Sequence, residues 1–180
     1  MSASDLLPKR LDELGIVKYP AAVLRKPCVP VVTFDAQLSD FVARMTELML
    51  EAPGVGLAAP QVGVSLRLFV FNPTGQPGDH GCCINPVITD ARKPEESIEG
   101  CLSIPGVEVS IRRATTITLR AFAPDGSAFE LGAFGLLARI WQHEADHLDG
   151  RLIIDNLSEA DKIQTRRQLK QLRDDYQARR

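Results

Sequence analysis

The chain has 180 residues, of which 44% are hydrophobic and 24% are charged. This length and composition predict a single domain over residues 1–180 with its own hydrophobic core. The 21 Lys and Arg residues and 23 Asp and Glu residues give a net charge of -2, which excludes whole-molecule charge as a basis for nucleic-acid binding. No run reaches the roughly 20 apolar residues of a membrane span, and the N-terminus lacks the apolar core of a signal peptide. We therefore expect a cytoplasmic protein with no membrane contact.

The first half of the chain predicts a helix followed by strands. Apolar residues spaced three and four apart predict an amphipathic helix over residues 36–50, which Pro53 and Gly54 end. Short runs rich in apolar and β-branched residues predict strands at 66–71, 82–89, 107–111, 115–122 and 127–131. The last two should form an antiparallel hairpin, because Pro124, Asp125 and Gly126 between them favour a tight turn.

Two further helices are predicted after the strands. Residues 133–148 have apolar side chains on two faces and are followed by Gly150, which predicts a helix buried on most sides. Trp141 on that helix fits core packing. A last helix over residues 158–178, with Ser158 as its N-cap, has a narrow apolar stripe and should lie on the outside.

The strongest chemical signal is the segment His143-Glu144-Ala145-Asp146-His147. Histidines four residues apart on a helix project from the same face and can bind one metal ion, and Glu144 stands where a general base would act. The alternative is a helix that carries two histidines by chance. A catalytic site needs a third protein ligand, and the metzincin pattern does not provide it, because Ile153 occupies the position of the third histidine.

Two other segments carry possible functional groups. Cys101, in the segment EGCLS, could supply a thiolate to a metal ion. The segment GVGLAAPQ from Gly54 to Gln61 contains GxGxxA but follows a predicted helix, so it does not fit a dinucleotide-binding turn. Its glycines could let the backbone approach a ligand, and Gln61 could donate a hydrogen bond to developing negative charge. A simple glycine-rich turn is the alternative.

In this order, GVGLAAPQ, EGCLS and QHEADH match the three signature motifs of the peptide deformylases, and the sequence resembles that family over about residues 15–157. The resemblance implies an α+β fold in which antiparallel β-sheets pack around a central buried HExxH helix. Residues 15–157 would be the catalytic core, with the C-terminal helix outside it. The implied reaction removes the N-formyl group from the formyl-methionine of newly synthesised polypeptides and releases formate.

The resemblance also implies roles for particular residues. Cys101, His143 and His147 would bind one divalent metal ion, characteristically Fe²⁺, although Zn²⁺ or Co²⁺ could use the same ligands. Glu144 would transfer the proton of the attacking water to the leaving amine, and the Gln61 side chain and the Leu102 backbone N–H would stabilise the oxyanion. The methionine pocket and the peptide contacts would come from Val55, Gly56, Leu57, Leu136 and Ile140.

Some residues depart from the family pattern or lie outside it. Glu108 stands where many bacterial members have an arginine, so the preference for residues after methionine stays open. Arg113 matches a common arginine of the family, but a surface ion pair explains it equally well. Cys28, Cys82 and Cys83 fit buried or half-buried reduced thiols.

The C-terminal helix has an excess of basic residues, which suggests a partner. Two acidic residues, Asp174 and Asp175, stand against six basic ones: Arg166, Arg167, Lys170, Arg173, Arg179 and Arg180. A solvated helix face is the usual explanation. The resemblance to bacterial deformylases with such a helix suggests a second explanation, which is transient contact with ribosomal phosphates.

Two other functions remain open at this point. An HExxH metallopeptidase would cleave unformylated peptides, and a non-catalytic, ribosome-associated relative would keep the fold without turnover. The presence of Gln61, Cys101, His143, Glu144 and His147 together argues against the second.

Overall fold

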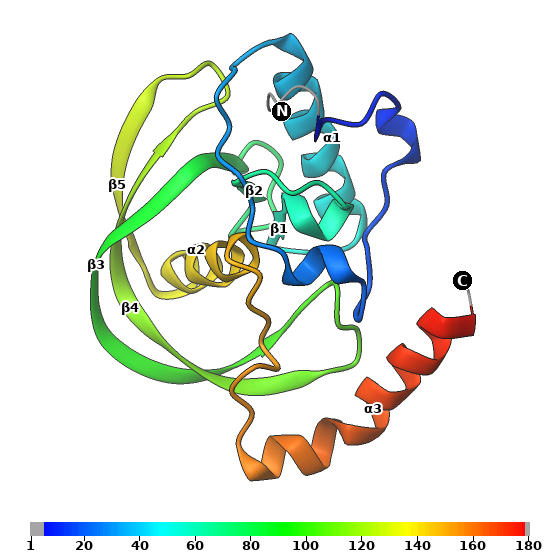
Figure 1. The fold of residues 1–180 in the computed structure, drawn as a ribbon. Helices are drawn as coiled ribbons and strands as arrows, with labels where there is room; N and C mark the ends of the chain where they lie inside the picture. Colours follow the sequence, from blue (N-terminus) through cyan, green and yellow to red (C-terminus); the bar gives the residue numbers. More distant parts are fainter. Residues whose placement is uncertain (1–5, 179–180) are drawn as a thin grey trace.

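The computed structural model describes residues 6–178 and has an α+β fold (Figure 1). Five strands form one antiparallel sheet in the order β1-β2-β3-β4-β5. The strands are β1 Gly56–Ala58, β2 Leu68–Phe71, β3 Gly81–Gly100, β4 Glu108–Phe122 and β5 Ala128–Phe134. The α-helices are α1 Ala36–Glu51, α2 Gly135–Leu148 and α3 Glu159–Ala178. Three short 3-10 helices are η2 Leu11–Glu13, η3 Ala22–Arg25 and η4 Ala59–Val62.

The long β3–β4 hairpin gives the sheet its curved shape, and α2 lies inside that curve (Figure 1). The strands predicted at 107–111 and 115–122 are one continuous strand, β4. Strand β3 extends to Gly100, well past the predicted residue 89, because the backbone of 90–100 pairs with β4. This part of β3 is mostly exposed and polar, so it lacks the apolar alternation that marks a half-buried strand. The strands form one sheet rather than several.

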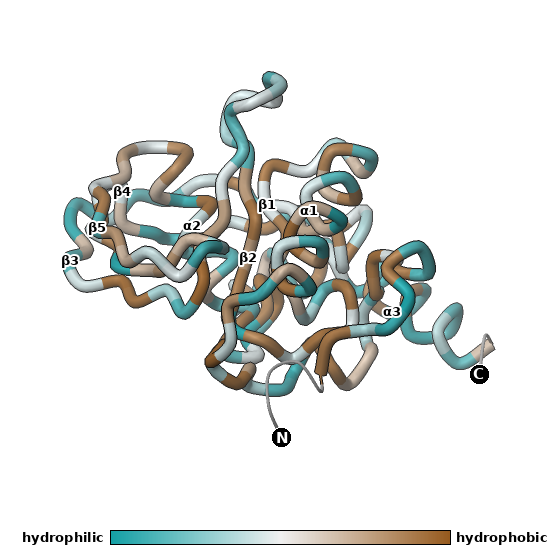
Figure 2. Tube along the Cα trace, turned by 90° about the horizontal axis from the view of Figure 1, so that it is seen from above, coloured by the Kyte–Doolittle hydropathy of each residue, from teal (hydrophilic) through white to brown (hydrophobic). Residues whose placement is uncertain are grey.

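Helix α1 confirms the prediction for residues 36–50 to within one residue. The Asp35 side chain caps it by accepting a hydrogen bond from Leu38 N at 2.9 Å. Its apolar face, which includes Phe41, Met45 and Met49, packs with residues of β1 and β2 in one hydrophobic cluster. Figure 2 shows that the trace along β2 is hydrophobic, and buried residues of β2 belong to the same cluster as those of α1.

Helix α2 begins at Gly135, two residues later than predicted, because Ala133 and Phe134 pair with β4 as the end of β5. Trp141 is buried, as predicted, and its ring makes an edge contact with Phe71 at a centroid distance of 5.4 Å. Leu136, in the first turn, is 54% exposed. The helix therefore buries its middle and its C-terminal end and leaves its first turn open.

Helix α3 lies on the outside, as predicted, with Thr165 and Leu169 as its buried residues. Ser158 precedes it, and its hydroxyl accepts a hydrogen bond from Asp161 N at 3.1 Å, which confirms the predicted N-cap. Arg179 and Arg180 lie outside the described residues. Between residues 6 and 178 no helix combines the length and the apolar character that crossing a membrane requires.

Candidate metal centre and active site

A thiol and two imidazoles converge at one point of the fold. One turn of α2 separates His143 from His147, whose ring centroids are 5.0 Å apart, and Cys101 follows β3 directly. The ligand atoms of the three residues all lie within 4.8 Å of one another, and the Cys101 sulfur is 3.3 Å from His147 Nε2. Sulfur and imidazole nitrogen together suit a divalent transition metal such as Zn²⁺ or Fe²⁺, and three protein ligands leave room for water or substrate. The residues present therefore fit a catalytic metal ion.

Glu99 orients the first histidine. Its Oε2 lies 3.0 Å from His143 Nδ1, and Arg113 donates to both of its oxygens at 2.6 and 2.9 Å. Arg139 adds a third cationic contact at 2.8 Å. Burial acts to raise the pKa of Glu99, but the hydrogen bonds from His143 and Arg113 prevail and lower it to about 2. Since an ionised carboxylate only accepts hydrogen bonds, Nδ1 of His143 carries a proton, and Nε2 is the nitrogen that would bind a metal ion after losing any proton of its own.

The second histidine has a different environment. His147 is buried, and its Nδ1 has no hydrogen-bond partner among the described residues. Burial lowers the pKa of His147 well below its usual value, and the nearby charges of His143 and Arg113 act in the same direction. His147 is therefore held in the neutral form, which is the form that binds metal ions.

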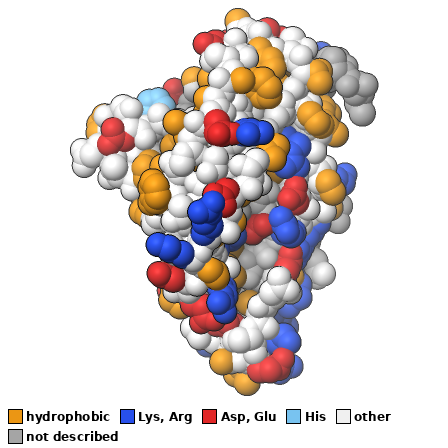
Figure 3. All heavy atoms as spheres, turned by 90° about the vertical axis from the view of Figure 1, so that its left-hand side faces the viewer, with side chains coloured by type: hydrophobic (Ala, Val, Ile, Leu, Met, Phe, Trp, Pro, Cys, Tyr) orange, Lys and Arg blue, Asp and Glu red, His pale blue; other side chains and the backbone are white. Residues whose placement is uncertain are grey.

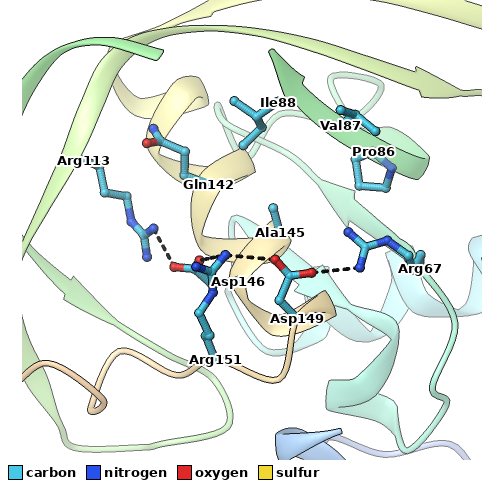
Figure 4. Close-up of a pocket in the computed structure, with 10 residues that line it drawn as sticks. All are labelled: Arg67, Pro86, Val87, Ile88, Arg113, Gln142, Ala145, Asp146, Asp149 and Arg151. Atoms are coloured by element: carbon cyan, nitrogen blue, oxygen red, sulfur yellow. Dashed lines mark hydrogen bonds and ion pairs between the residues drawn. The ribbon is translucent and has the colours of Figure 1, made fainter. Parts of the chain in front are cut away.

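Arg113 connects this centre to a chain of ion pairs that runs to the surface (Figure 4). It is buried and contacts Asp146 of α2 at 2.8 Å. Arg151 then bridges Asp146 and Asp149 at 3.0 and 2.9 Å, and Arg67 contacts Asp149 at 2.8 Å beside a cavity of about 420 Å³. The alternative interpretation of Arg113 as part of a surface ion pair is therefore wrong, because this residue is buried behind the metal ligands. Sequence reasoning gave no role to Glu99 or Arg139, since no local spacing links them to the histidines.

Glu144 is buried beside the three ligands. One of its oxygens, Oε2, has no hydrogen-bond partner in the part of the chain that the structure describes. Burial raises the pKa of Glu144 to about 7, although the positive charges of His143 and Arg113 oppose this. A carboxyl group with a pKa near neutrality can both accept and return a proton.

Two hydrogen-bond donors lie next to Cys101. Ala58 N donates to Gln61 Oε1 at 2.8 Å, which turns Nε2 of Gln61 toward the Cys101 sulfur at 3.5 Å and the Ser103 hydroxyl at 3.3 Å. The N–H of Leu102 has no acceptor within residues 6–178. The Leu102 N–H is therefore available to a ligand beside the metal centre, and the Gln61 NH₂ group lies next to it, where it contacts Cys101 and Ser103.

A cavity of about 400 Å³ opens beside these residues. Val55, Gly56, Leu136 and Ile140 line it, together with Cys101, Leu102, Gln61, His143 and Glu144. Leu57 does not line it, because its side chain is fully buried in the hydrophobic cluster around α1. In the strand β1, the Leu57 side chain points to the opposite side from Gly56, so the predicted contact of Leu57 with the peptide stays a prediction for its backbone.

Comparison with known proteins agrees with this geometry. A sequence profile described as polypeptide deformylase matches residues 13–163. The chain belongs to the polypeptide deformylase family. It is 41% identical to a peptide deformylase of Hahella chejuensis over 88% of this chain and 95% of the relative, and 46% identical to peptide deformylase 1 of Bacillus anthracis over 81% and 92%. A crystal structure of a peptide deformylase from Legionella pneumophila superposes with a TM-score of 0.85 at 41% identity, covering 93% of this chain and 98% of that one.

Membership of the deformylase family determines the class of reaction. Polypeptide deformylases are metal-dependent hydrolases that remove the N-formyl group from new polypeptides. The comparisons do not favour an HExxH metallopeptidase or a non-catalytic relative. The α+β fold predicted from the resemblance is confirmed.

Proposed function

We propose that Cys101, His143 and His147 bind the catalytic metal ion of this deformylase and that Glu144 transfers the proton during hydrolysis. The observation that carries this proposal is the convergence of three ligand atoms within 4.8 Å beside a buried carboxyl group. The ion is Fe²⁺ in our proposal, as the resemblance implies, and Zn²⁺ or Co²⁺ are alternatives for the same donors. When bound, such an ion acts as a Lewis acid on water and on the formyl carbonyl.

The side chains around the ligands then carry out the proton transfers. Glu144 accepts a proton from the attacking water, whose oxygen forms a bond to the formyl carbon. When the bond between that carbon and the methionine nitrogen breaks, Glu144 returns the proton to the leaving amine. Formate and a free N-terminal methionine result. The pKa of Glu144, raised by burial to about 7, suits both transfers.

Gln61 and Leu102 stabilise the charge that develops on the formyl oxygen. The Gln61 amide is already turned by Ala58 so that its NH₂ group faces the site, and the Leu102 N–H is free. Donors that are fixed before the reaction pay no cost of reorganisation when the charge appears. We assign the oxyanion-stabilising role to these two groups.

The cavity beside Cys101 accommodates the methionine side chain. Val55, Leu136, Ile140 and Ile98 give it apolar walls, and Gly56 brings the backbone of β1 close to the substrate. An apolar slot suits a flexible thioether.

We also propose a single domain whose catalytic core is about 15–157, with α3 as an appended helix that contacts the ribosome. Arg166, Arg167 and Lys170 are exposed, and no described acidic side chain forms an ion pair with them. Unpaired basic residues on a helix suit phosphate contacts. We propose the cytoplasm as the location of the protein, as a site where nascent chains leave the ribosome.

The deciding experiment measures formate release from formyl-Met-Ala-Ser. The protein is purified without oxygen, reconstituted with Fe²⁺, and compared with a metal-free sample and with the variant Cys101→Ala. We expect formate only from the metal-loaded protein with Cys101 intact. Metal-loaded protein that releases no formate would overturn the proposal, and unformylated peptides would then be tested as substrates.

A further inference from the structure

A three-residue segment near the N-terminus, Val17 to Tyr19, connects both walls of the site. Val17 N donates to Gln61 O at 2.7 Å, and Tyr19 N donates to Ser103 O at 2.8 Å. Between them, Lys18 Nζ donates to Leu102 O at 2.7 Å. The segment therefore holds in place Gln61 and Leu102, the two residues to which we assigned stabilisation of the oxyanion. Lys18 is the residue of this segment that makes its contact through its side chain.

The charge of Lys18 has no counter-charge from a carboxylate. Lys18 is half-buried, and no acidic side chain within residues 6–178 lies within ion-pair distance of its ammonium group. The neutral carbonyl of Leu102 is its hydrogen-bond partner in the described structure. Removing a cation from water without a counter-charge costs free energy. Burial accordingly lowers the pKa of Lys18, while the nearby Cys101 side chain opposes that shift.

The hydrogen bond of Lys18 also helps to fix the direction of the Leu102 N–H. Ile104 N donates to Cys101 O at 2.9 Å, which holds the peptide plane between Cys101 and Leu102. Lys18 holds the next plane through the Leu102 carbonyl. Since peptide groups are planar, fixing both planes leaves Leu102 little freedom to rotate its N–H away from the site.

We propose that Lys18 is a positioning residue of the deformylation reaction. It holds the Leu102 donor in place, and its positive charge favours the negative charge that develops on the formyl oxygen beside Cys101. This inference rests on the proposed function, because it requires the oxyanion to form at Gln61 and Leu102. Since that charge exists only in the transition state, losing Lys18 should lower kcat and leave KM nearly unchanged.

The test compares Lys18→Met, Lys18→Gln and Lys18→Arg with the wild-type chain, all loaded with the same metal. Lys26→Met is the matched control, because Lys26 is exposed and lies outside the site. We measure kcat and KM for a formyl-methionyl peptide, the bound metal by elemental analysis, and the melting temperature. We expect Lys18→Met and Lys18→Gln to lower kcat about 10-fold with KM within about 2-fold, at full metal content. Lys18→Arg should recover most of kcat, and Lys26→Met should match the wild type.

Each other outcome has a defined meaning. Wild-type kcat in both uncharged variants would overturn the inference. A raised KM with unchanged kcat, or a loss of bound metal that accounts for the lost activity, would also overturn it. If Lys18→Met does not fold, Lys18→Gln decides, since its amide can still donate to the Leu102 carbonyl but carries no charge. Absence of formate release from the metal-loaded wild type would instead reject the proposed function.

Discussion

At the residue scale, Gly56 is needed for the close approach of β1 to Glu144. A Cβ atom at position 56 would overlap Glu144 Oε1 and would lie 2.8 Å from Cδ of the same flexible side chain. We therefore expect Gly56→Ala to displace the carboxylate and to lower kcat/KM about 100-fold, with little change in melting temperature. Gly132→Ala is the control, because nothing lies within 4 Å of its added methyl group. Wild-type activity in Gly56→Ala would show that the position of the carboxylate is not critical.

Glu144 itself gives a second prediction at this scale. Glu144→Gln keeps the shape of the side chain but removes the group that accepts and returns the proton. Because the metal ligands are Cys101, His143 and His147 in our proposal, the variant should bind metal in the normal ratio while kcat falls about 1000-fold. Formate release and elemental analysis of the same sample check both parts. Loss of metal from the variant would assign Glu144 a ligand role instead.

At the scale of secondary-structure elements, α3 can be separated from catalysis. Ending the chain after Leu157 should keep kcat/KM within about 3-fold, because no residue of α3 lines the active-site cavity. Co-sedimentation with ribosomes should weaken and should depend on salt concentration in the intact protein. Since truncation also removes the buried side chain of Leu169, a full-length variant with Arg166, Arg167 and Lys170 changed to Gln serves as the control. Unchanged sedimentation of this variant would reject the ribosome contact.

At the scale of the whole molecule, acidic and basic side chains nearly balance, with 23 Asp and Glu residues against 21 Lys and Arg residues. Acidic and basic side chains are interspersed over the face shown in Figure 3. This pattern agrees with the net charge of -2. Ionisation of the thiols removed from water gives a clearer test of the free energy of unfolding than the surface ion pairs do, because each surface ion pair contributes little to that free energy.

The buried Cys28 and the half-buried Cys82 predict how stability depends on pH. Burial raises the pKa of Cys28 to about 11 and that of Cys82 to about 12, from 9.0. The unfolded chain therefore loses these protons first, so their contribution is complete below pH 9 and is lost as pH rises through 11 and 12. The free energy of unfolding, measured by urea denaturation, should be lower at pH 10 than at pH 8. The double variant with Cys28→Ala and Cys82→Ala should show a smaller fall. Its fall should differ from that of the wild type by at most about 1.4 kcal/mol per thiol per pH unit. An equal fall in both proteins would contradict the assignment.

The sequence alone was sufficient wherever a few neighbouring residues decide the structure. The period of apolar residues predicted α1, Ser158 predicted the start of α3, and the spacing of His143 and His147 predicted that their rings lie together on one face of a helix. Cys101, Gln61 and Leu102 followed from motifs that resemble a known family. These predictions depend on helix geometry and on short motifs, which need no knowledge of distant contacts.

Only the tertiary structure revealed the residues that support this site. Glu99 meets Arg139 across 40 positions of the chain, and Lys18 meets Leu102 across 84. The exposed half of β3 forms a strand through its pairing with β4 rather than through a pattern of its own. Contacts of this kind depend on strand pairing and on packing against the sheet, where many distant residues act together, so no local spacing in the sequence encodes them.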